Sequence, residues 1–253
     1  MIYIRIYKSS KWFAQNGDNT RLQTKAFIAM KTDWYYTINQ FAVRTVGNFA
    51  KTLELTQYHH TMLESMAQKY PLDPDYIAML ARYAPAHQHF TATYTKFNVA
   101  DGLMQGSTLD MKLHLKALMA KAQLWSSMVK AAGFDRDSEV YESLFPRGLR
   151  PFNTGAADER VSNVATLALS MQPHAALAAV RLQVEAFSTL ITNVRSTQLA
   201  NKANKKSLSK HTEQARKTVL KEQYRNVGRL MEKFADTPKM ILPFFNVQRL
   251  RQR

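Results

Sequence analysis

Hydrophobic residues recur at three- and four-residue steps through most of the chain, which is the period of an amphipathic α-helix. The first clear row is Met111, Leu115, Leu118, Ala122, Trp125 and Val129. The second is Leu177, Val180, Val184, Phe187, Ile191 and Val194. A third, Leu220, Tyr224, Val227, Met231 and Phe234, predicts the inward face of the last helix. Such narrow rows predict helices that pack nearly antiparallel at a shallow crossing angle.

Glycine, proline and polar clusters predict where these helices begin and end. The segment 70–74 contains two prolines and predicts a turn, with Asp73 as the N-cap of the following helix. Two glycines predict a loop over 101–107, and the polar run at 201–207 predicts a turn or a frayed join. Residues 133–155 are the least regular stretch, with three glycines and two prolines.

We therefore predict an all-α fold, an elongated antiparallel bundle of about five to seven helices over residues 21–236. The predicted segments are, in order, a short extended arm (1–20), a first helical half (21–132), an irregular corner (133–155), a second helical half (156–236) and an irregular basic tail (237–253). Because prolines and glycines are few, at eight each in 253 residues, the elements are expected to be long.

Composition excludes several classes of function. The chain contains no cysteine, which excludes disulfides, thiolate zinc sites and a thiol nucleophile. We see no apolar run approaching the roughly 18 residues of a membrane span, and the N-terminus lacks a secretory core. The sequence therefore predicts a protein without a membrane span that is cytoplasmic, or a component of a particle assembled there.

The net charge of +16 is concentrated near the C-terminus. From Arg195 to Arg253, fifteen Lys and Arg residues stand against four acidic ones, which leaves +11. Such a surface can hold a polyanion through phosphate contacts and counterion release. The candidate polyanion-binding residues are Lys202, Lys205, Lys206, Lys210, Lys217, Lys221, Arg225, Arg229, Lys233, Arg249, Arg251 and Arg253. The alternative interpretation is that these cations form a solvated helix face.

The sequence shows no pattern that carries catalysis or ligates a metal. Its histidines lack the spacing of a helical metal pair, and we find neither a phosphate-binding glycine-rich loop nor a nucleophile elbow. We therefore predict no catalytic, cofactor or metal site. Phe244 and Phe245, beyond the last helix, either fold back over an exposed apolar row or insert into a neighbouring subunit. They are the candidate assembly contact.

Several motifs of the C-terminal half are similar to those of a known group of proteins. The motifs are Trp125, Leu144-Phe145-Pro146-x-Gly148, Phe152, Gly155, Arg160, Leu167, Arg195, Gln198, Tyr224-Arg225-Asn226-x-Gly228-x-Leu230-Met231 and Pro243-Phe244-Phe245. Over roughly residues 105–250 the chain resembles uncharacterised all-helical bundle proteins of environmental and gut bacteria, a family with no known activity. The resemblance implies a shared helical fold and implies nothing about a site.

These observations favour a non-enzymatic structural or interaction protein. It would act through helical packing and a basic C-terminal surface, with a protein partner or self-association. The alternative is a sequence-nonspecific nucleic-acid-binding protein that uses the basic last helix and tail.

Overall fold

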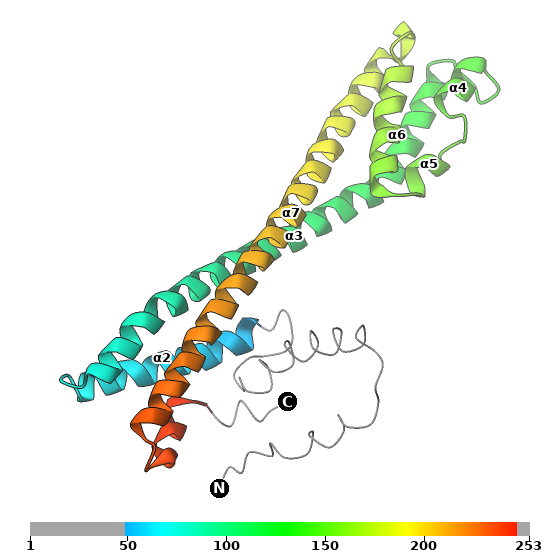
Figure 1. The fold of residues 1–253 in the computed structure, drawn as a ribbon. Helices are drawn as coiled ribbons and strands as arrows, with labels where there is room; N and C mark the ends of the chain where they lie inside the picture. The colour runs from blue at the N-terminus through cyan, green and yellow to red at the C-terminus, as the bar shows by residue number, and fades with distance from the viewer. Residues whose placement is uncertain (1–48, 247–253) are drawn as a thin grey trace, which may run out of the picture. The chain divides into compact units, whose positions relative to one another are not determined.

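The computed structural model describes residues 49–246, in which helices alternate with short turns and no strand occurs (Figure 1). The elements are α2 (Phe49–Lys69), α3 (Pro74–Ala131), α4 (Glu139–Leu144), α5 (Arg150–Asn153), α6 (Ala157–Ser170), the 3-10 helix η1 (Ala175–Leu177), α7 (Ala178–Lys233) and the 3-10 helix η2 (Pro238–Phe244). The predicted all-α bundle of about five to seven helices is confirmed. The predicted arm at 1–20, the start of the first helix, and Arg249, Arg251 and Arg253 lie outside the described residues.

Two breaks that the sequence pattern predicted lie inside long, continuous helices. The loop expected at 101–107 is wrong, because α3 runs unbroken for 58 residues through both glycines. A glycine inside a helix costs roughly 1 kcal/mol relative to alanine, which the packing of a long helix can offset. The turn expected at 201–207 is also wrong, because this stretch lies inside the 56-residue α7. There the Lys205 ammonium pairs with Asp101, and the Asn201 amide donates to the Leu103 carbonyl at 3.3 Å.

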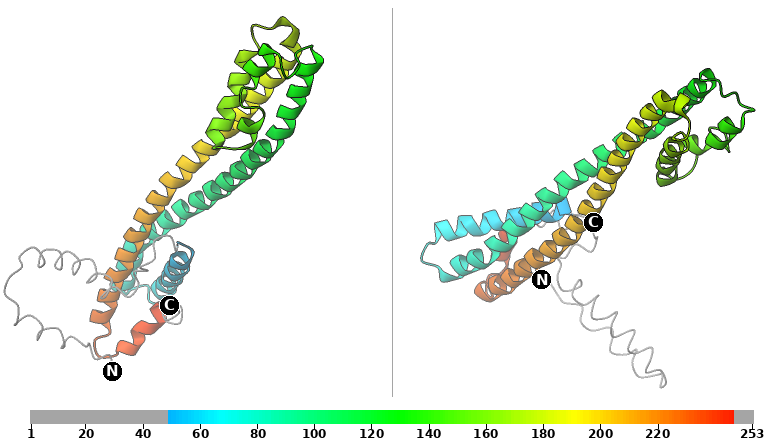
Figure 2. Two further views of the ribbon diagram at one scale, coloured as in Figure 1. Left: turned by 90° about the vertical axis from the view of Figure 1, so that its right-hand side faces the viewer. Right: turned by 90° about the horizontal axis from the view of Figure 1, so that it is seen from above.

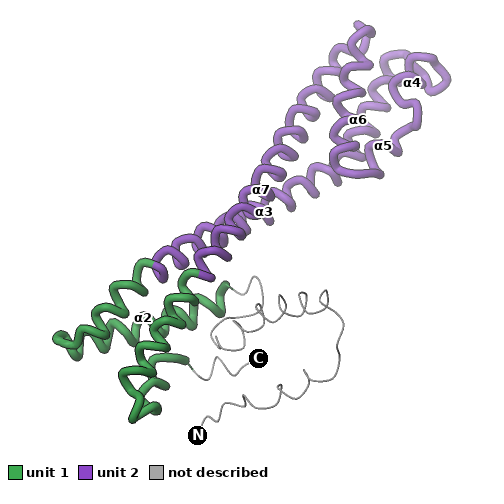
Figure 3. Tube along the Cα trace, viewed as in Figure 1, with its two compact units in different colours: residues 1–85, 218–253 green, residues 86–217 purple. Residues whose placement is uncertain are grey.

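The described chain forms two compact units, and each long helix contributes to both (Figure 3). Unit 1 combines residues up to Pro85 with those from Thr218 onward, and unit 2 comprises Ala86–Lys217. This division differs from the two helical halves expected at 21–132 and 156–236. The irregular corner at 133–155 does not separate the units, because it lies wholly within unit 2.

The core of unit 2 is built from α3 and α7 with the short helices α4, α5 and α6 (Figures 1 and 2). Within this unit α3 and α7 run antiparallel, because Thr93, Asp101 and Leu103 contact positions progressively nearer the start of α7. The two clearest apolar rows meet here, and Trp125 packs edge-on against Phe187 with ring centroids 5.6 Å apart.

The corner at 133–155 turns through glycines that adopt left-handed backbone angles. Gly155 has φ +104°, a conformation that other residues rarely adopt. A Cβ at this position would also lie 2.6 Å from the Glu159 carboxylate, which accepts a hydrogen bond from the Ala156 N–H at 3.1 Å. Arg160 then fixes the corner to α3, because its guanidinium donates to the carbonyls of Phe152 and Leu115.

Unit 1 packs α2, the start of α3, the end of α7 and η2 together. The predicted inward face of the last helix is only partly right. Leu220 is buried and Phe234 packs on Phe244, but Gln223, Asn226 and Leu230 are buried as well, whereas Met231 is 59% exposed. The buried face contains polar side chains, so hydrophobic spacing alone selected the neighbouring row. The tail is also more regular than predicted, since Pro238–Phe244 forms a 3-10 helix.

One helical segment of the described chain, Ala175–Lys233, contains an 18-residue window that is apolar enough to cross a membrane by length and composition alone. This differs from the sequence prediction that no apolar run approaches that length. Leu177, Val184 and Ile191 in its first part belong to the buried core of unit 2.

Candidate functional site

The predicted basic surface divides into cations that pair within the protein and cations that do not. Of the nine predicted residues that the structure describes, four have a carboxylate partner: Lys205 with Asp101, Arg225 with Glu222, Arg229 with Asp75 and Glu232, and Lys233 with Asp73 and Asp75. These pairs offset part of the positive charge that the sequence assigns to α7. The row predicted from Lys217 to Lys233 is therefore not a uniform polyanion surface.

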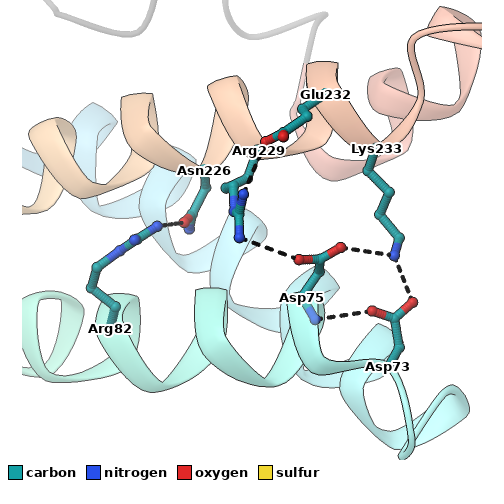
Figure 4. Close-up of polar contacts among 7 residues, drawn as sticks. All are labelled: Asp73, Asp75, Arg82, Asn226, Arg229, Glu232 and Lys233. Carbon is teal, nitrogen blue, oxygen red and sulfur yellow. Dashed lines mark hydrogen bonds and ion pairs between the residues drawn. The ribbon is translucent and has the colours of Figure 1, made fainter.

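The most connected of these pairs joins the end of α7 to the start of α3 in unit 1 (Figure 4). Lys233 Nζ lies 2.7 Å from Asp73 Oδ2 and 3.3 Å from Asp75 Oδ2. Asp73 Oδ1 also accepts the Asp75 N–H at 3.0 Å, which confirms the predicted N-cap. The same carboxylate thus caps one helix and binds another.

The ion pair changes the pKa of both partners. The hydrogen bond from Lys233 holds the pKa of Asp73 below its ordinary value, and the same bond raises the pKa of Lys233. The pair therefore contributes its full stability above the ordinary pKa of aspartate, about 4, and this stability is lost as the pH falls through the lowered pKa of Asp73. At alkaline pH, the pair contributes its full stability below the ordinary pKa of lysine, about 10.4. This stability is lost as the pH rises through the raised pKa of Lys233.

The remaining cations are exposed and have no ion-pair partner among residues 49–246. They are Lys202, Lys206, Lys210, Lys217 and Lys221. The first four belong to unit 2 and recur in steps of four or seven, so they occupy one face of α7. We call Lys202, Lys206, Lys210 and Lys217 the lysine row. It is the part of the predicted polyanion surface in unit 2 that is exposed and without an ion-pair partner among the described residues.

A buried polar network holds unit 1 together. His59 is fully buried, and its Nδ1 lies 3.0 Å from the Phe244 carbonyl oxygen. Its Nε2 lies 3.1 Å from Asn226 Nδ2, and Asn226 Oδ1 accepts a hydrogen bond from Arg82 Nη2 at 3.0 Å. Arg82 Nε in turn lies 3.2 Å from Glu222. The network joins α2, α3, α7 and η2.

The hydrogen-bond partners of Asn226 determine which ring nitrogen of His59 carries the proton. A guanidinium can only donate, so the Asn226 oxygen must face Arg82 and its amide nitrogen must face His59. The histidine Nε2 is therefore an acceptor, and the ring proton lies on Nδ1, which donates to the Phe244 carbonyl. Both ring nitrogens are occupied, so this histidine acts as a structural link rather than as a general base.

Phe244 and Phe245 fold back within the chain, which is the first of the two alternatives that the sequence left open. Phe244 is fully buried, and Phe245 stacks on His59 with ring centroids 4.7 Å apart. Phe244 also lies against Tyr76 and Phe234. Buried side chains offer no surface to a neighbouring subunit, so the fold-back alternative holds. Phe244 of the tail itself therefore covers the apolar rings of Tyr76 and Phe234 at this end of unit 1.

An exposed apolar row on α3 was missed by the sequence analysis. Val99, Leu103, Leu109, Leu113 and Leu124 each expose between 47% and 60% of their surface. Gly102, Gly106, Ala117 and Ala120 lie between them and are also exposed. We call these nine residues the outer stripe. Three- and four-residue steps connect them along one face of the helix. Met111, Leu118 and Trp125 on the opposite face are buried in the core of unit 2.

Unit 2 also has surface hollows, and one of about 850 Å³ lies beside α5 and the start of α6. Arg147 and Arg150 line it, and its two carboxylates, Asp158 and Glu159, already have structural partners. Arg195 donates to both oxygens of Asp158 at 2.7 and 2.8 Å and holds the pKa of this carboxyl below its ordinary value. Glu159 accepts the Ala156 N–H. Within residues 49–246, no group of three or more histidines and carboxylates is arranged to hold a metal ion.

Comparison with known proteins adds no relative to this description. No protein-family model matches the chain, and neither a curated protein nor a solved structure gives a match.

Proposed function

We propose that the protein is a non-enzymatic interaction protein, and that a helix of a protein partner docks along the outer stripe of α3. The stripe itself supports this function. Large contiguous apolar patches on a protein surface generally mark interaction sites, whereas single exposed leucines need no explanation. Five large aliphatic residues in one continuous row form such a patch.

The geometry of the stripe favours a helical partner. Its nine residues, large and small together, are connected by three- and four-residue steps, as the buried residues on the opposite face of α3 are. Small residues at 102, 106, 117 and 120 lie between the leucines and allow a second helix to approach closely. Burying the row would contribute roughly 25 cal/mol per Å² of apolar surface removed from water.

Site-specific photo-crosslinking in the native cells tests this function. A benzophenone side chain at position 113 is expected to give a protein adduct of discrete mass, because Leu113 lies in the middle of the outer stripe. The control places the same side chain at position 182, since Leu182 is 61% exposed on α7 and lies outside the stripe. Adducts that are absent at 113, or equal at the two positions, would show that the stripe is not a docking surface.

Polyanion binding is the second candidate function, and the lysine row favours it. Lys202, Lys206, Lys210 and Lys217 are exposed along one face of α7. Contacts of this kind bind phosphates without reading sequence, and they weaken steeply with salt. This interpretation requires only the accessible cations, not the row at Arg225, Arg229 and Lys233 that pairs internally.

Retention on heparin and on duplex DNA at increasing salt tests this second function. Replacing Lys202, Lys206 and Lys210 by Glu is expected to reduce the slope of log affinity against log salt by at least about 2.7, or 0.9 for each lost phosphate contact. The matched control, Glu at positions 112, 116 and 121 of α3, makes the same change in net charge elsewhere. Equal losses in both variants would mean that net charge alone governs retention.

A further inference from the structure

We propose that the partner helix carries an apolar seam flanked by glutamate or aspartate. This inference rests on the proposed function and specifies the chemistry of the partner. The basis is the charge that borders the outer stripe. Lys112 directly precedes Leu113, Lys116 directly precedes Ala117, and Lys121 directly follows Ala120. All three lysines are exposed and have no ion-pair partner among the described residues.

These lysines occupy the two edges of the stripe. On a helix, the residues directly before and after a seam position lie on opposite sides of the seam. Lys112 and Lys116 therefore border one edge, and Lys121 borders the other. In packed helix pairs these edge positions face the charged residues of the partner and determine which partner is accepted. Two lysine-bordered edges favour a partner with acidic edges.

The carboxylates of this part of α3 form no ion pair with the three edge lysines. Between residues 96 and 124 the helix has two, Asp101 and Asp110. Asp101 pairs with Lys205 of α7. Asp110 is exposed on the same edge as Lys121, because it directly follows Leu109, and it lies 3.4 Å from His114 on its own helix. The edge lysines therefore remain available to a partner.

An antiparallel second copy of the chain is a poor occupant of the stripe. If two α3 helices packed antiparallel through it, Lys112 and Lys116 would face the same two lysines of the second copy. Like charges across an interface oppose association. A partner with acidic edges avoids this repulsion and gains ion pairs.

A membrane surface also fits the stripe less well. Helices that lie on membranes bury a broad apolar face and commonly carry tryptophan or phenylalanine on it. The outer stripe contains no aromatic residue, and four of its nine residues are glycine or alanine. A narrow row with small residues is shaped for another helix.

Three synthetic helical peptides test the inference on the full-length protein. They share one leucine and alanine seam and carry glutamate, glutamine or lysine at the edge positions. In fluorescence anisotropy, the glutamate peptide is expected to bind about tenfold more tightly than the glutamine peptide, as three partly exposed ion pairs would give. The lysine peptide is expected to bind more weakly than both.

Charge exchange provides the specific control. Replacing Lys112, Lys116 and Lys121 by Glu is expected to transfer the preference from the glutamate to the lysine peptide. Leu113→Asp is expected to abolish binding of both, whereas Leu182→Asp, an equally exposed position on α7, leaves it unchanged. Circular dichroism confirms that each variant is folded.

The outcomes separate this inference from the proposed function. If the glutamine peptide binds as tightly as the glutamate peptide, the inference of an acidic partner is wrong. If Leu113→Asp still abolishes binding in that case, the proposed docking surface remains supported. The inference is overturned if the glutamate peptide does not bind at micromolar concentration. It is also overturned if anionic vesicles or a second copy of the chain bind through Leu113 instead. Whenever the inference fails, a protein partner crosslinked at position 113 still supports the proposed function.

Discussion

Replacing Asn226 by leucine is expected to lower the free energy of unfolding by about 3 kcal/mol. Leucine keeps the branched outline of the side chain but has bulkier methyl groups, so the loss combines the missing hydrogen bonds with some crowding of the buried site. The substitution leaves the buried Nε2 of His59 without its donor, and Arg82 loses its acceptor. Arg82 is partly exposed and can turn to water, whereas His59 is fully buried. Most of the cost therefore arises at the histidine, and urea unfolding measures it.

Gln223 offers a matched control on the same helix. Its side chain is also buried, but its amide oxygen has no hydrogen-bond partner among the described residues. Gln223→Met removes an unsatisfied polar atom, so we expect the free energy of unfolding to stay within about 1 kcal/mol of the wild type or to rise. Equal losses in Asn226→Leu and Gln223→Met would contradict the role of the network.

A double-mutant cycle measures the coupling between the two linked residues. His59→Phe alone removes the donor to the Phe244 carbonyl and leaves the Asn226 amide without its acceptor. In the double variant, His59→Phe with Asn226→Leu, neither side of the lost bond is left unsatisfied. The double variant is expected to cost about 1–2 kcal/mol less than the sum of the single ones.

The core of unit 2 was predictable because its two main rows of buried residues are apolar. The row through Met111, Leu118 and Trp125 repeats at the helical period without a polar interruption, and all three are buried. Hydrophobic spacing reports such a face directly. The row beginning at Leu177 was predictable for the same reason.

The end of α7 could not be predicted in this way. Its buried face includes Arg216, Gln223 and Asn226, which are polar in every scale of hydrophobicity. Asn226 is buried because Arg82 and His59, far away in the sequence, supply its partners. A single sequence does not show which distant residue satisfies a polar group, so the neighbouring apolar row was chosen instead.

The helical spacing of the outer stripe is present in the sequence, but the loop predicted at 101–107 interrupts it. Val99, Leu109 and Leu113 fit one helical face only if 101–107 is helical, and two glycines there indicated a break. Local glycine costs are small, and a long antiparallel pairing outweighs them. Gly102 and Gly106, which predicted the loop, are themselves part of the outer stripe. The charge pairs of Lys205 and Lys233 likewise depend on carboxylates more than a hundred residues away.

Replacing Phe244 by alanine is expected to cost about 3–5 kcal/mol of stability. The ring is fully buried and lies 6.0 Å from the Tyr76 ring, measured between centroids. Truncation removes this packing and loosens the backbone carbonyl that accepts from His59. Chemical denaturation gives the total cost. Hydrogen exchange is expected to accelerate first at η2, because its attachment to α2 depends on this side chain.

Leu242→Ala on the same 3-10 helix is the control, since Leu242 is 55% exposed, and its cost should stay within about 0.5 kcal/mol. Light scattering on both variants separates the two interpretations of the aromatic pair. A buried Phe244 predicts that both variants keep the oligomeric state of the wild type while only Phe244→Ala loses stability. An oligomer that dissociates in Phe244→Ala, with monomer stability unchanged, would instead make this residue an assembly contact. The burial of the ring against Tyr76 and Phe234 favours the first result.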